Sequence, residues 1–310
     1  MTALAGDGTY MGFVGVTTGG SSIMKVFPKW AEVLGLPTRT LIGHDVDMGA
    51  PPEVYRDVVS SIKDDPDHWG ALVTTHKIAV FESAGDLFDD LDDLAQTFGE
   101  ISSIAKRGNR LTGAAKDPVT VRLALEDFLP ADHFATTGAA ALVLGSGGSG
   151  CALSHQLGVR DDQPSRVICT ARSHHKLDHQ RELHERAGID ADLMQYVITP
   201  SPEDVDDLLG VLPPSSLVVN ATGMGKDRPG SPVTDAGRFP DSGVLWEFNY
   251  RGSLEFLRQA RHQQSERGLV VEDGWRYFVH GWTQVIADVF DIPMPRETVD
   301  QLARVAAGVR

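Results

Sequence analysis

A glycine-rich stretch in the middle of the chain gives the clearest indication of what chemistry the protein could support. It reads Gly145-Ser146-Gly147-Gly148-Ser149-Gly150, after the apolar run AAALVL and before a helical pattern. In a strand-turn-helix unit, Gly145 would permit the tight turn, Gly147 would let a pyrophosphate approach the backbone, and Gly150 would allow close packing. The N–H groups of the helix then face the anion. The stretch predicts a dinucleotide-binding turn; a turn without a ligand is the alternative.

The end of the next predicted strand discriminates between the nicotinamide dinucleotides. A carboxylate about twenty residues on binds the ribose 2′-hydroxyl of NAD, whereas an arginine accommodates the 2′-phosphate of NADP. Here the strand RVICT leads into Ala171-Arg172-Ser173, with no carboxylate at that position. A guanidinium pairs bidentately with phosphate and stays charged. We expect Arg172 to bind the 2′-phosphate, with Ala171 and Ser173 beside it, so NADP is favoured over NAD.

Two other clusters could suggest a metal. His174, His175, His179 and His184 follow Arg172, but no cysteine or carboxylate accompanies them at a matched spacing, so we predict surface histidines and no metal site. The acidic run from Asp86 to Asp93 lacks the glycine spacing of a calcium loop. We expect it to be a solvated helix end.

Strand and helix patterns alternate along the chain, which is typical of an α/β fold. In the first part, strands are expected at 12–18, 39–43 and 71–74, each followed by a helix, and a Gly108-Asn109 turn joins the segments 101–105 and 110–114. A helix at 117–128 bridges to a second alternation with strands at 139–144, 166–170, 193–198, 217–220 and 244–247. These five strands predict a doubly wound unit, followed by helices at 253–267, 275–290 and 297–309.

Composition narrows the classes of protein. The chain has 310 residues, of which 41% are hydrophobic and 23% charged, as in a globular protein of two domains. Its formal net charge of -15 argues against nucleic acid as a partner. The two cysteines, Cys151 and Cys169, lie in apolar stretches, so we expect no disulfide. With no signal-like start and no run long enough for a membrane span, we expect a cytoplasmic protein without a membrane partner.

Eight short motifs occur in an order that resembles the shikimate/quinate dehydrogenase family across nearly the whole chain. They are Ser21-Ser22, Val73-Thr74-Thr75-His76-Lys77, Gly99 to Ile104, Ala115-Lys116-Asp117, Gly145 to Gly150, Asn220-Ala221-Thr222-Gly223-Met224, Glu247-Phe248-Asn249-Tyr250 and Asp273-Gly274. The resemblance implies an N-terminal α/β substrate and catalytic domain, residues 1–118 plus about 272–310, and a doubly wound Rossmann NADP-binding domain, residues 119–271. It also adds Asn220, Ala221, Thr222, Gly223 and Met224 to the cofactor site.

A lysine and an aspartate form the catalytic pair in that family, and the resemblance places these roles on Lys77 and Asp117. Hydride transfer to a carbonyl leaves an alkoxide, which a positioned cation or acid can stabilise and protonate. The alternative is structural: Lys77 would be a surface residue at a helix start, and Asp117 would be the N-cap of a helix over 118–128.

Departures from the family pattern concern the substrate. The resemblance implies that the substrate is held by Ser21, Ile23, Thr74, Ser102, Lys116, Tyr250, Trp282 and Gln284. Ile23 stands where the family has the second of two carboxylate-binding serines. Lys116 replaces a threonine, and Trp282, with Gln284 nearby, aligns with a glutamine. A site built to hydrogen-bond one group rejects analogues that leave its partners unpaired. We therefore expect a ring without a carboxylate, or one with another anion such as a phosphate.

The resulting functional expectation is an NADP-dependent oxidoreductase that interconverts a ketone and a secondary alcohol on a small polyhydroxylated six-membered ring, a cyclitol or carbasugar. Two alternatives stay open. One is a true shikimate or quinate dehydrogenase with a remodelled pocket, and the other is a non-catalytic NADP-binding regulatory protein. A homodimer is also left open.

Overall fold

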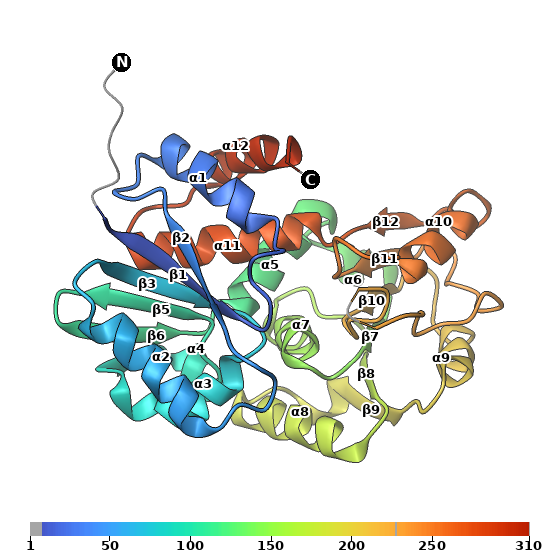
Figure 1. Cartoon of the computed structure of the whole chain (residues 1–310). Helices are drawn as coiled ribbons and strands as arrows, with labels where there is room; N and C mark the ends of the chain where they lie inside the picture. Colours follow the sequence, from blue (N-terminus) through green and yellow to red (C-terminus); the bar gives the residue numbers. More distant parts are fainter. Residues whose placement is uncertain (1–7, 227, 310) are drawn as a thin grey trace. The chain divides into compact units, whose positions relative to one another are not determined.

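The chain folds into two compact units, each built around its own sheet (Figure 1). The structure is a computed structural model that describes residues 8–226 and 228–309. One unit consists of two segments of the chain, up to Lys116 and from Val279 onward, and the other comprises Asp117–Phe278. Each contains a six-stranded sheet. The two-domain α/β fold predicted from the sequence is confirmed.

The sheet of the first unit brings several loops to one edge. Its strands follow the order β2-β1-β3-β5-β6-β4. β1 runs parallel to β2 and β3, whereas β5 is antiparallel to both β3 and β6. The ends of β1, β3 and β6 and the start of β5 therefore share one edge. The strand bounds are β1 Tyr10–Gly15, β2 Leu41–Asp45, β3 His68–Val73, β4 Asp90–Leu91, β5 Ser103–Arg107 and β6 Arg110–Ala114.

Helices cover both faces of this sheet. Successive residues of a strand point to opposite faces, so apolar residues of one strand pack against helices on both sides. Val14 belongs to a core cluster with Val59 of α2, whereas the ring of Phe13 lies 4.9 Å from that of Trp282 on α11. Trp30 of α1 donates a hydrogen bond from Nε1 to the carbonyl of Leu302 on α12, at 2.8 Å. The helices are α1 Ile23–Leu34, α2 Pro52–Asp64, α3 Lys77–Ala84, α4 Asp93–Phe98, α11 Trp275–Phe290 and α12 Arg296–Ala307, with a 3₁₀ turn at Gly85–Leu87.

The second unit is a doubly wound parallel sheet with the order β12-β11-β10-β7-β8-β9. The direction of winding reverses between β7 and β10, and in such sheets ligands bind in the crevice outside the carboxyl ends of the strands at that point. The strands are β7 Ala141–Leu144, β8 Val167–Ala171, β9 Met194–Ile198, β10 Leu217–Asn220, β11 Val244–Glu247 and β12 Val270–Glu272. The sequence predicted the first five, whereas β12 was not expected.

Apolar helix faces bury this second sheet. All four residues of β7 are buried, as expected for a central parallel strand covered on both faces. One core cluster joins Leu142 of β7 with Val205 of α9 and Phe256 of α10. The helices are α5 Asp117–Phe128, α6 His133–Thr137, α7 Gly148–Val159, α8 His174–Arg186, α9 Pro202–Leu209 and α10 Glu255–Arg267, with a 3₁₀ turn at Ala191–Leu193.

The acidic run is solvated, as expected, since four of its five aspartates are exposed, but it is more than a helix end. The run contains the short strand β4 and the start of α4. The Asp92 side chain caps α4 by accepting a hydrogen bond from the Ala95 N–H at 2.6 Å. Asp89 accepts hydrogen bonds from the Leu111 N–H and from Lys63. The two carboxylates accept hydrogen bonds from backbone and lysine donors. These contacts hold the chain around β6 in place.

Two further sequence expectations concern the cysteines and the membrane. Cys151 and Cys169 are both buried and free, which confirms the absence of a disulfide between them. Within residues 8–226 and 228–309, the helices are all too short or too polar to cross a bilayer.

Candidate active site

The glycine stretch forms a tight turn between β7 and α7, as predicted. Gly145 has a φ of 102°, and a Cβ there would lie 3.0 Å from the Ala221 carbonyl oxygen. A Cβ on Gly150 would lie 1.9 Å from the Gly145 oxygen. In contrast, a Cβ on Gly147 would meet nothing within 4 Å, and this residue is the N-cap of α7 without a side-chain cap. The helix start is thus open to an anionic ligand.

A cavity of about 480 Å³ opens above this turn. The glycine turn lines it together with the end of β8, the loop after β9 and the loop after β10. Arg172 lines it, as predicted, next to Ala171 and Ser173. Ser146 is tied into the turn, since its hydroxyl donates to the Thr170 carbonyl at 3.0 Å. The site therefore offers a backbone cradle for phosphates and a guanidinium beside it.

Two cations at this cavity were not assigned from the sequence. Lys176, in the first turn of α8, and Arg228, in the loop after β10, both line it. Lys176 could have been indicated by its place in the helix that directly follows Arg172, because the start of that helix lies beside the end of β8. No pattern identifies Arg228, whose loop is folded back by a 2.7 Å hydrogen bond from the Gly225 N–H to the Arg228 carbonyl. Three positive side chains thus face a site predicted to bind phosphates.

The expectation that all four nearby histidines lie on the surface was wrong for His184. His174 and His175 are exposed and His179 is half-buried, but His184 is 2% exposed. Its Nε2 lies 2.8 Å from the Ser154 hydroxyl and its Nδ1 2.7 Å from the Tyr196 hydroxyl. Burial lowers the pKa of His184 to about 4. This residue joins α7 to α8, and the ring is accommodated because both nitrogens have hydroxyl partners.

The loop after β10, which carries Asn220 to Met224, is held by a chain of hydrogen bonds. The Asn220 side-chain oxygen accepts from the Thr222 N–H at 3.1 Å and from its hydroxyl at 2.6 Å. The Thr222 hydroxyl in turn accepts from the Met224 N–H at 3.1 Å. Gly223 has a φ of 74°. Ala221, Thr222 and Met224 line the cavity, so this loop forms its wall opposite β8.

In the first unit, backbone hydrogen bonds bring Thr74, Lys77 and Ser102 to one sheet edge. The Thr74 N–H bonds to the Val14 carbonyl at 3.0 Å, directly after β3. The carbonyl of Lys77, the first residue of α3, accepts from the Ile101 N–H at 3.0 Å. The Ser102 N–H bonds to the Ala114 carbonyl at 2.9 Å. Thr74, Lys77, Ser102 and the end of β6 are therefore neighbours.

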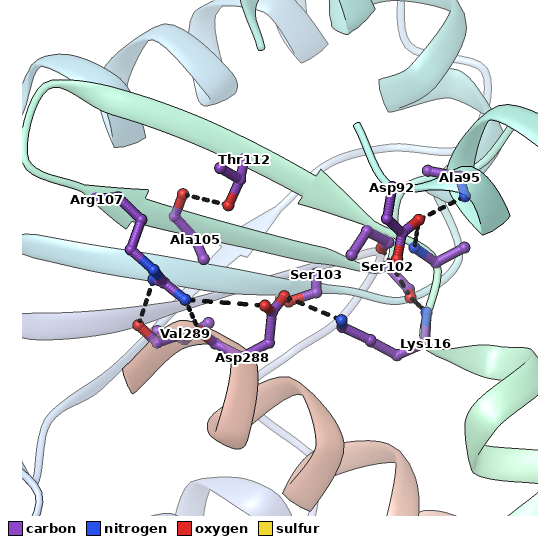
Figure 2. A network of polar contacts seen from close by, with 12 residues as sticks. Asp92, Ala95, Ser102, Ser103, Ala105, Arg107, Thr112, Lys116, Asp288 and Val289 are labelled. Carbon is purple, nitrogen blue, oxygen red and sulfur yellow. Dashed lines mark hydrogen bonds and ion pairs between the residues drawn. The ribbon is translucent and has the colours of Figure 1, made fainter. Parts of the chain in front are cut away.

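The Lys116 ammonium is paired within its own unit (Figure 2). It lies 3.6 Å from Asp288 of α11, whose carboxylate also accepts a 2.6 Å hydrogen bond from the Ser103 hydroxyl. The Lys116 N–H donates to the Ser102 hydroxyl at 2.7 Å. Arg107 contacts Asp288 from the other side. Because Asp288 compensates part of its charge, Lys116 gives less support to an anionic substrate than its sequence position indicated.

The remaining predicted substrate positions of the first unit, which are Ser21, Ile23, Trp282 and Gln284, differ in polarity. Ser21 lies in the loop before α1, where its N–H bonds to the Thr18 carbonyl at 3.0 Å. Ile23 begins α1 and is fully buried. Trp282 is buried against Phe13, and Gln284 on the same helix is half-buried. No hydroxyl is available from Ile23 or Trp282 at the places where the family pattern has polar groups.

Two residues of the predicted catalytic and substrate-binding set belong to the second unit. Asp117 is the first residue of α5 and is 8% exposed. Tyr250 packs its ring at 4.5 Å from Phe278, and Arg251 lies over it. The assignment of Lys77 and Asp117 as one catalytic pair spans the two units and stays a prediction.

Comparisons with known proteins support the resemblance. No protein-family model matches the chain. The shikimate dehydrogenase (NADP(+)) of Methylobacterium radiotolerans is 25% identical over 281 residues, 90% of each protein.

Solved structures show the same fold. Shikimate 5-dehydrogenase from Thermus thermophilus in complex with NADP(H) and shikimate has a TM-score of 0.70 at 22% identity, over 96% of this chain and 99% of that one. The 5-ketofructose reductase of a Gluconobacter strain has a TM-score of 0.71 at 16% identity, over 97% and 99%. The chain is therefore similar to shikimate dehydrogenases in sequence and in fold, and this similarity supports an oxidoreductase.

Proposed function

We propose that this protein is an NADP-dependent oxidoreductase that interconverts a ketone and a secondary alcohol on a polyhydroxylated six-membered ring, a cyclitol or carbasugar. The observation that carries the proposal is the cavity above the glycine turn, in which an uncapped helix N-terminus and the guanidinium of Arg172 line one space. The relative from Methylobacterium radiotolerans, named for NADP(+), supports the choice of cofactor.

The residues of the cavity fit this cofactor. Gly147 leaves room for the pyrophosphate at the start of α7, where N–H groups and the helix dipole favour an anion. Arg172, with Lys176, would hold the 2′-phosphate. The loop 221–224 forms the opposite wall. When bound, the nicotinamide donates or accepts the hydride, and the chain must supply the rest.

Lys77 is proposed to move the proton. In the reducing direction its ammonium would stabilise the developing alkoxide and protonate it; in the oxidising direction the neutral amine would take the hydroxyl proton. Asp117 would orient the substrate hydroxyl and the ammonium. Ser21, Thr74, Ser102 and Tyr250 would bind further hydroxyl groups of the ring, since hydroxyl side chains both donate and accept hydrogen bonds.

The proposed ring carries no carboxylate. Buried Ile23 offers no hydrogen bond, and buried Trp282 offers only the single donor of its indole N–H, which is less than a carboxylate needs to replace its hydration. The charge of Lys116 is already paired with Asp288, which favours an uncharged ring over a phosphorylated one. The structural likeness to 5-ketofructose reductase, which is named for a keto sugar, is consistent with this choice.

A second candidate is a shikimate or quinate dehydrogenase with a remodelled pocket, favoured by the name of the relative that aligns over 90% of the chain. Initial rates with NADP and NAD separate the two functions. The panel contains shikimate, quinate, uncharged cyclitols, amino-cyclitols and cyclitol phosphates. The proposal expects the highest kcat/KM with NADP and an uncharged cyclitol or carbasugar. It is wrong if shikimate or quinate is turned over far more efficiently.

A further inference from the structure

The carboxyl group of Glu247 lies at the end of β11, beside Asn220 at the end of β10, in the register of the parallel sheet. Its side chain is fully buried. One oxygen, Oε2, accepts a 2.7 Å hydrogen bond from the Asn220 amide. The other, Oε1, accepts from the Asn249 N–H at 2.8 Å and from the Asn249 amide at 2.7 Å. All three partners are donors, so the group is held as an acceptor at both oxygens.

Glu247 thereby fixes the orientation of the Asn220 amide. With its NH₂ group directed at Glu247, the Asn220 oxygen must face Thr222, where it accepts two hydrogen bonds. Asn249 adds a second connection, because its amide also donates to the Met224 carbonyl at 3.1 Å. The carboxyl group is therefore the common anchor of the loop 220–224, which lines the cofactor cavity.

The environment of Glu247 leaves its charge sensitive to pH near neutrality. Burial raises its pKa to about 7, against the lowering effect of the three amide donors. Among the described residues, the groups that act on its pKa are Asn220 and Asn249. Glu272, the last residue of the neighbouring strand β12, has its own pKa raised by burial and by the nearby carboxylates of Asp273 and Asp127. A protonated Glu247 would turn one acceptor into a donor and conflict with its N–H partners.

We propose that Glu247 is a positioning residue that holds the loop 220–224 in the shape required by the nicotinamide half of the dinucleotide. This inference rests on the proposed function. In a doubly wound fold the first three strands bind one mononucleotide and the next three bind the other. Glu247 and Asn220 lie on the second set, β10 to β12, whereas Arg172 and the glycine turn follow strands of the first set.

The test compares Glu247→Gln with wild type for binding of NADP and of 2′,5′-ADP, which lacks the nicotinamide half. In either orientation of the new amide, its NH₂ group meets an N–H donor, from Asn220 or from Asn249. A buried group left unpaired in this way should weaken NADP binding by roughly ten-fold. Binding of 2′,5′-ADP should stay within about two-fold of wild type. The double variant Asn220→Asp, Glu247→Gln exchanges donor and acceptor and should restore NADP binding.

A pH series adds a measurement that a merely structural role would not change. The 2′-phosphate of both ligands and the 5′-phosphate monoester of 2′,5′-ADP titrate in the same pH range, so wild type is compared with Glu247→Gln for each ligand separately. For NADP, the ratio of wild-type affinity to variant affinity should fall as the pH falls through about 7, whereas for 2′,5′-ADP this ratio should stay constant. Wild-type NADP affinity in Glu247→Gln, or an equal loss for both ligands, would overturn the inference. A wild-type protein that binds neither ligand would instead overturn the proposed function, and this inference with it.

Discussion

Lys77 begins α3, at the sheet edge where Thr74 and Ser102 are neighbours. If it transfers the proton, Lys77→Met should lower kcat by roughly 10²- to 10⁴-fold, because general acid-base catalysis contributes about that much. The dissociation constant for NADP should stay within about two-fold of wild type. Lys29→Met, at an exposed position of α1, is the matched control and should leave kcat unchanged. Normal turnover by Lys77→Met would refute the assigned role.

Arg172 lines the cofactor cavity from the turn after β8 and is exposed in the free protein. Arg172→Gln removes a charge-assisted contact to the 2′-phosphate, so NADP affinity should fall roughly 10- to 100-fold. Affinity for NAD, which lacks this phosphate, should change little. Titration calorimetry with both dinucleotides measures the difference, with Arg261→Gln on α10 as an exposed control. Equal losses for NADP and NAD would contradict the assignment.

At the residue scale, sequence patterns predicted the positions that depend on local order in the chain. The glycine turn follows β7, and Arg172 follows β8, which pairs with β7, so their proximity follows from one strand-helix-strand unit. The pairing of Lys116 with Asp288 was not predictable, because the two residues are far apart in sequence and meet only through packing of α11 on the first sheet. The hydrogen bond between Glu247 and Asn220 depends in the same way on the pairing of β10 with β11, whereas Asn249 is only two residues from Glu247 in the chain.

At the scale of elements, the glycines of the turn between β7 and α7 have different structural roles, so their substitution should have different effects. Gly150→Ala should destabilise the protein, because its Cβ would lie 1.9 Å from the Gly145 oxygen. Gly147→Ala should fold with a Tm close to wild type, since its Cβ meets no protein atom within 4 Å, yet it should lose most NADP affinity. Thermal unfolding and NADP titration of both variants check this. Unchanged NADP binding in Gly147→Ala would contradict the pyrophosphate position.

The packing of α7 on α8 predicts a dependence of stability on pH. Burial lowers the pKa of His184 to about 4, below the unfolded value of about 6.5. Between these values the unfolded chain binds a proton that the folded chain does not, so stability falls as the pH drops. His184→Gln should reduce the loss of unfolding free energy between pH 6.5 and pH 5 by about 2 kcal/mol. Urea unfolding at both pH values measures it; an identical loss would exclude His184 as the cause.

Glu247 makes stability depend on pH in the opposite direction to His184, because the pKa of Glu247 in the folded protein is raised to about 7. Its contribution decreases as the pH rises from about 4.5 to 7. The comparison of His184→Gln with wild type at each pH isolates the histidine, since Glu247 is common to both proteins.

Helices with a clear hydrophobic periodicity could be predicted from the sequence, whereas the shortest strands could not. The helices α5 and α11 have the predicted bounds, since long apolar-periodic segments give the clearest signal. The strands β4 and β12 have two and three residues. Their pairing depends on neighbouring strands rather than on their own residues, so no local pattern indicated them. In the acidic run, β4 was missed for the same reason, whereas the cap of α4 by Asp92 is a contact over three residues that a capping pattern could have indicated.

At the scale of the whole molecule, the alternation of strands and helices was enough to predict two α/β units and the Rossmann order of the second. Right-handed crossovers leave few ways to arrange such a sequence of elements. The chemistry of the substrate was less accessible, because it depends on which side chains in the first unit are already paired. Lys116 illustrates this point: its sequence position indicated an anion, whereas its contact with Asp288 favours an uncharged ring.

The central claim is that the chain transfers hydride between NADP and an uncharged polyhydroxylated ring. The most direct test is the initial rate of NADPH formation or consumption with uncharged cyclitols and carbasugars, in both directions, beside shikimate and quinate. We expect turnover of an uncharged ring, with kcat/KM at least about ten-fold above that for either acid. That ratio corresponds to about 1.4 kcal/mol of discrimination in the transition state. Efficient turnover of shikimate or quinate alone, or no NADP-linked turnover of any compound, would contradict it.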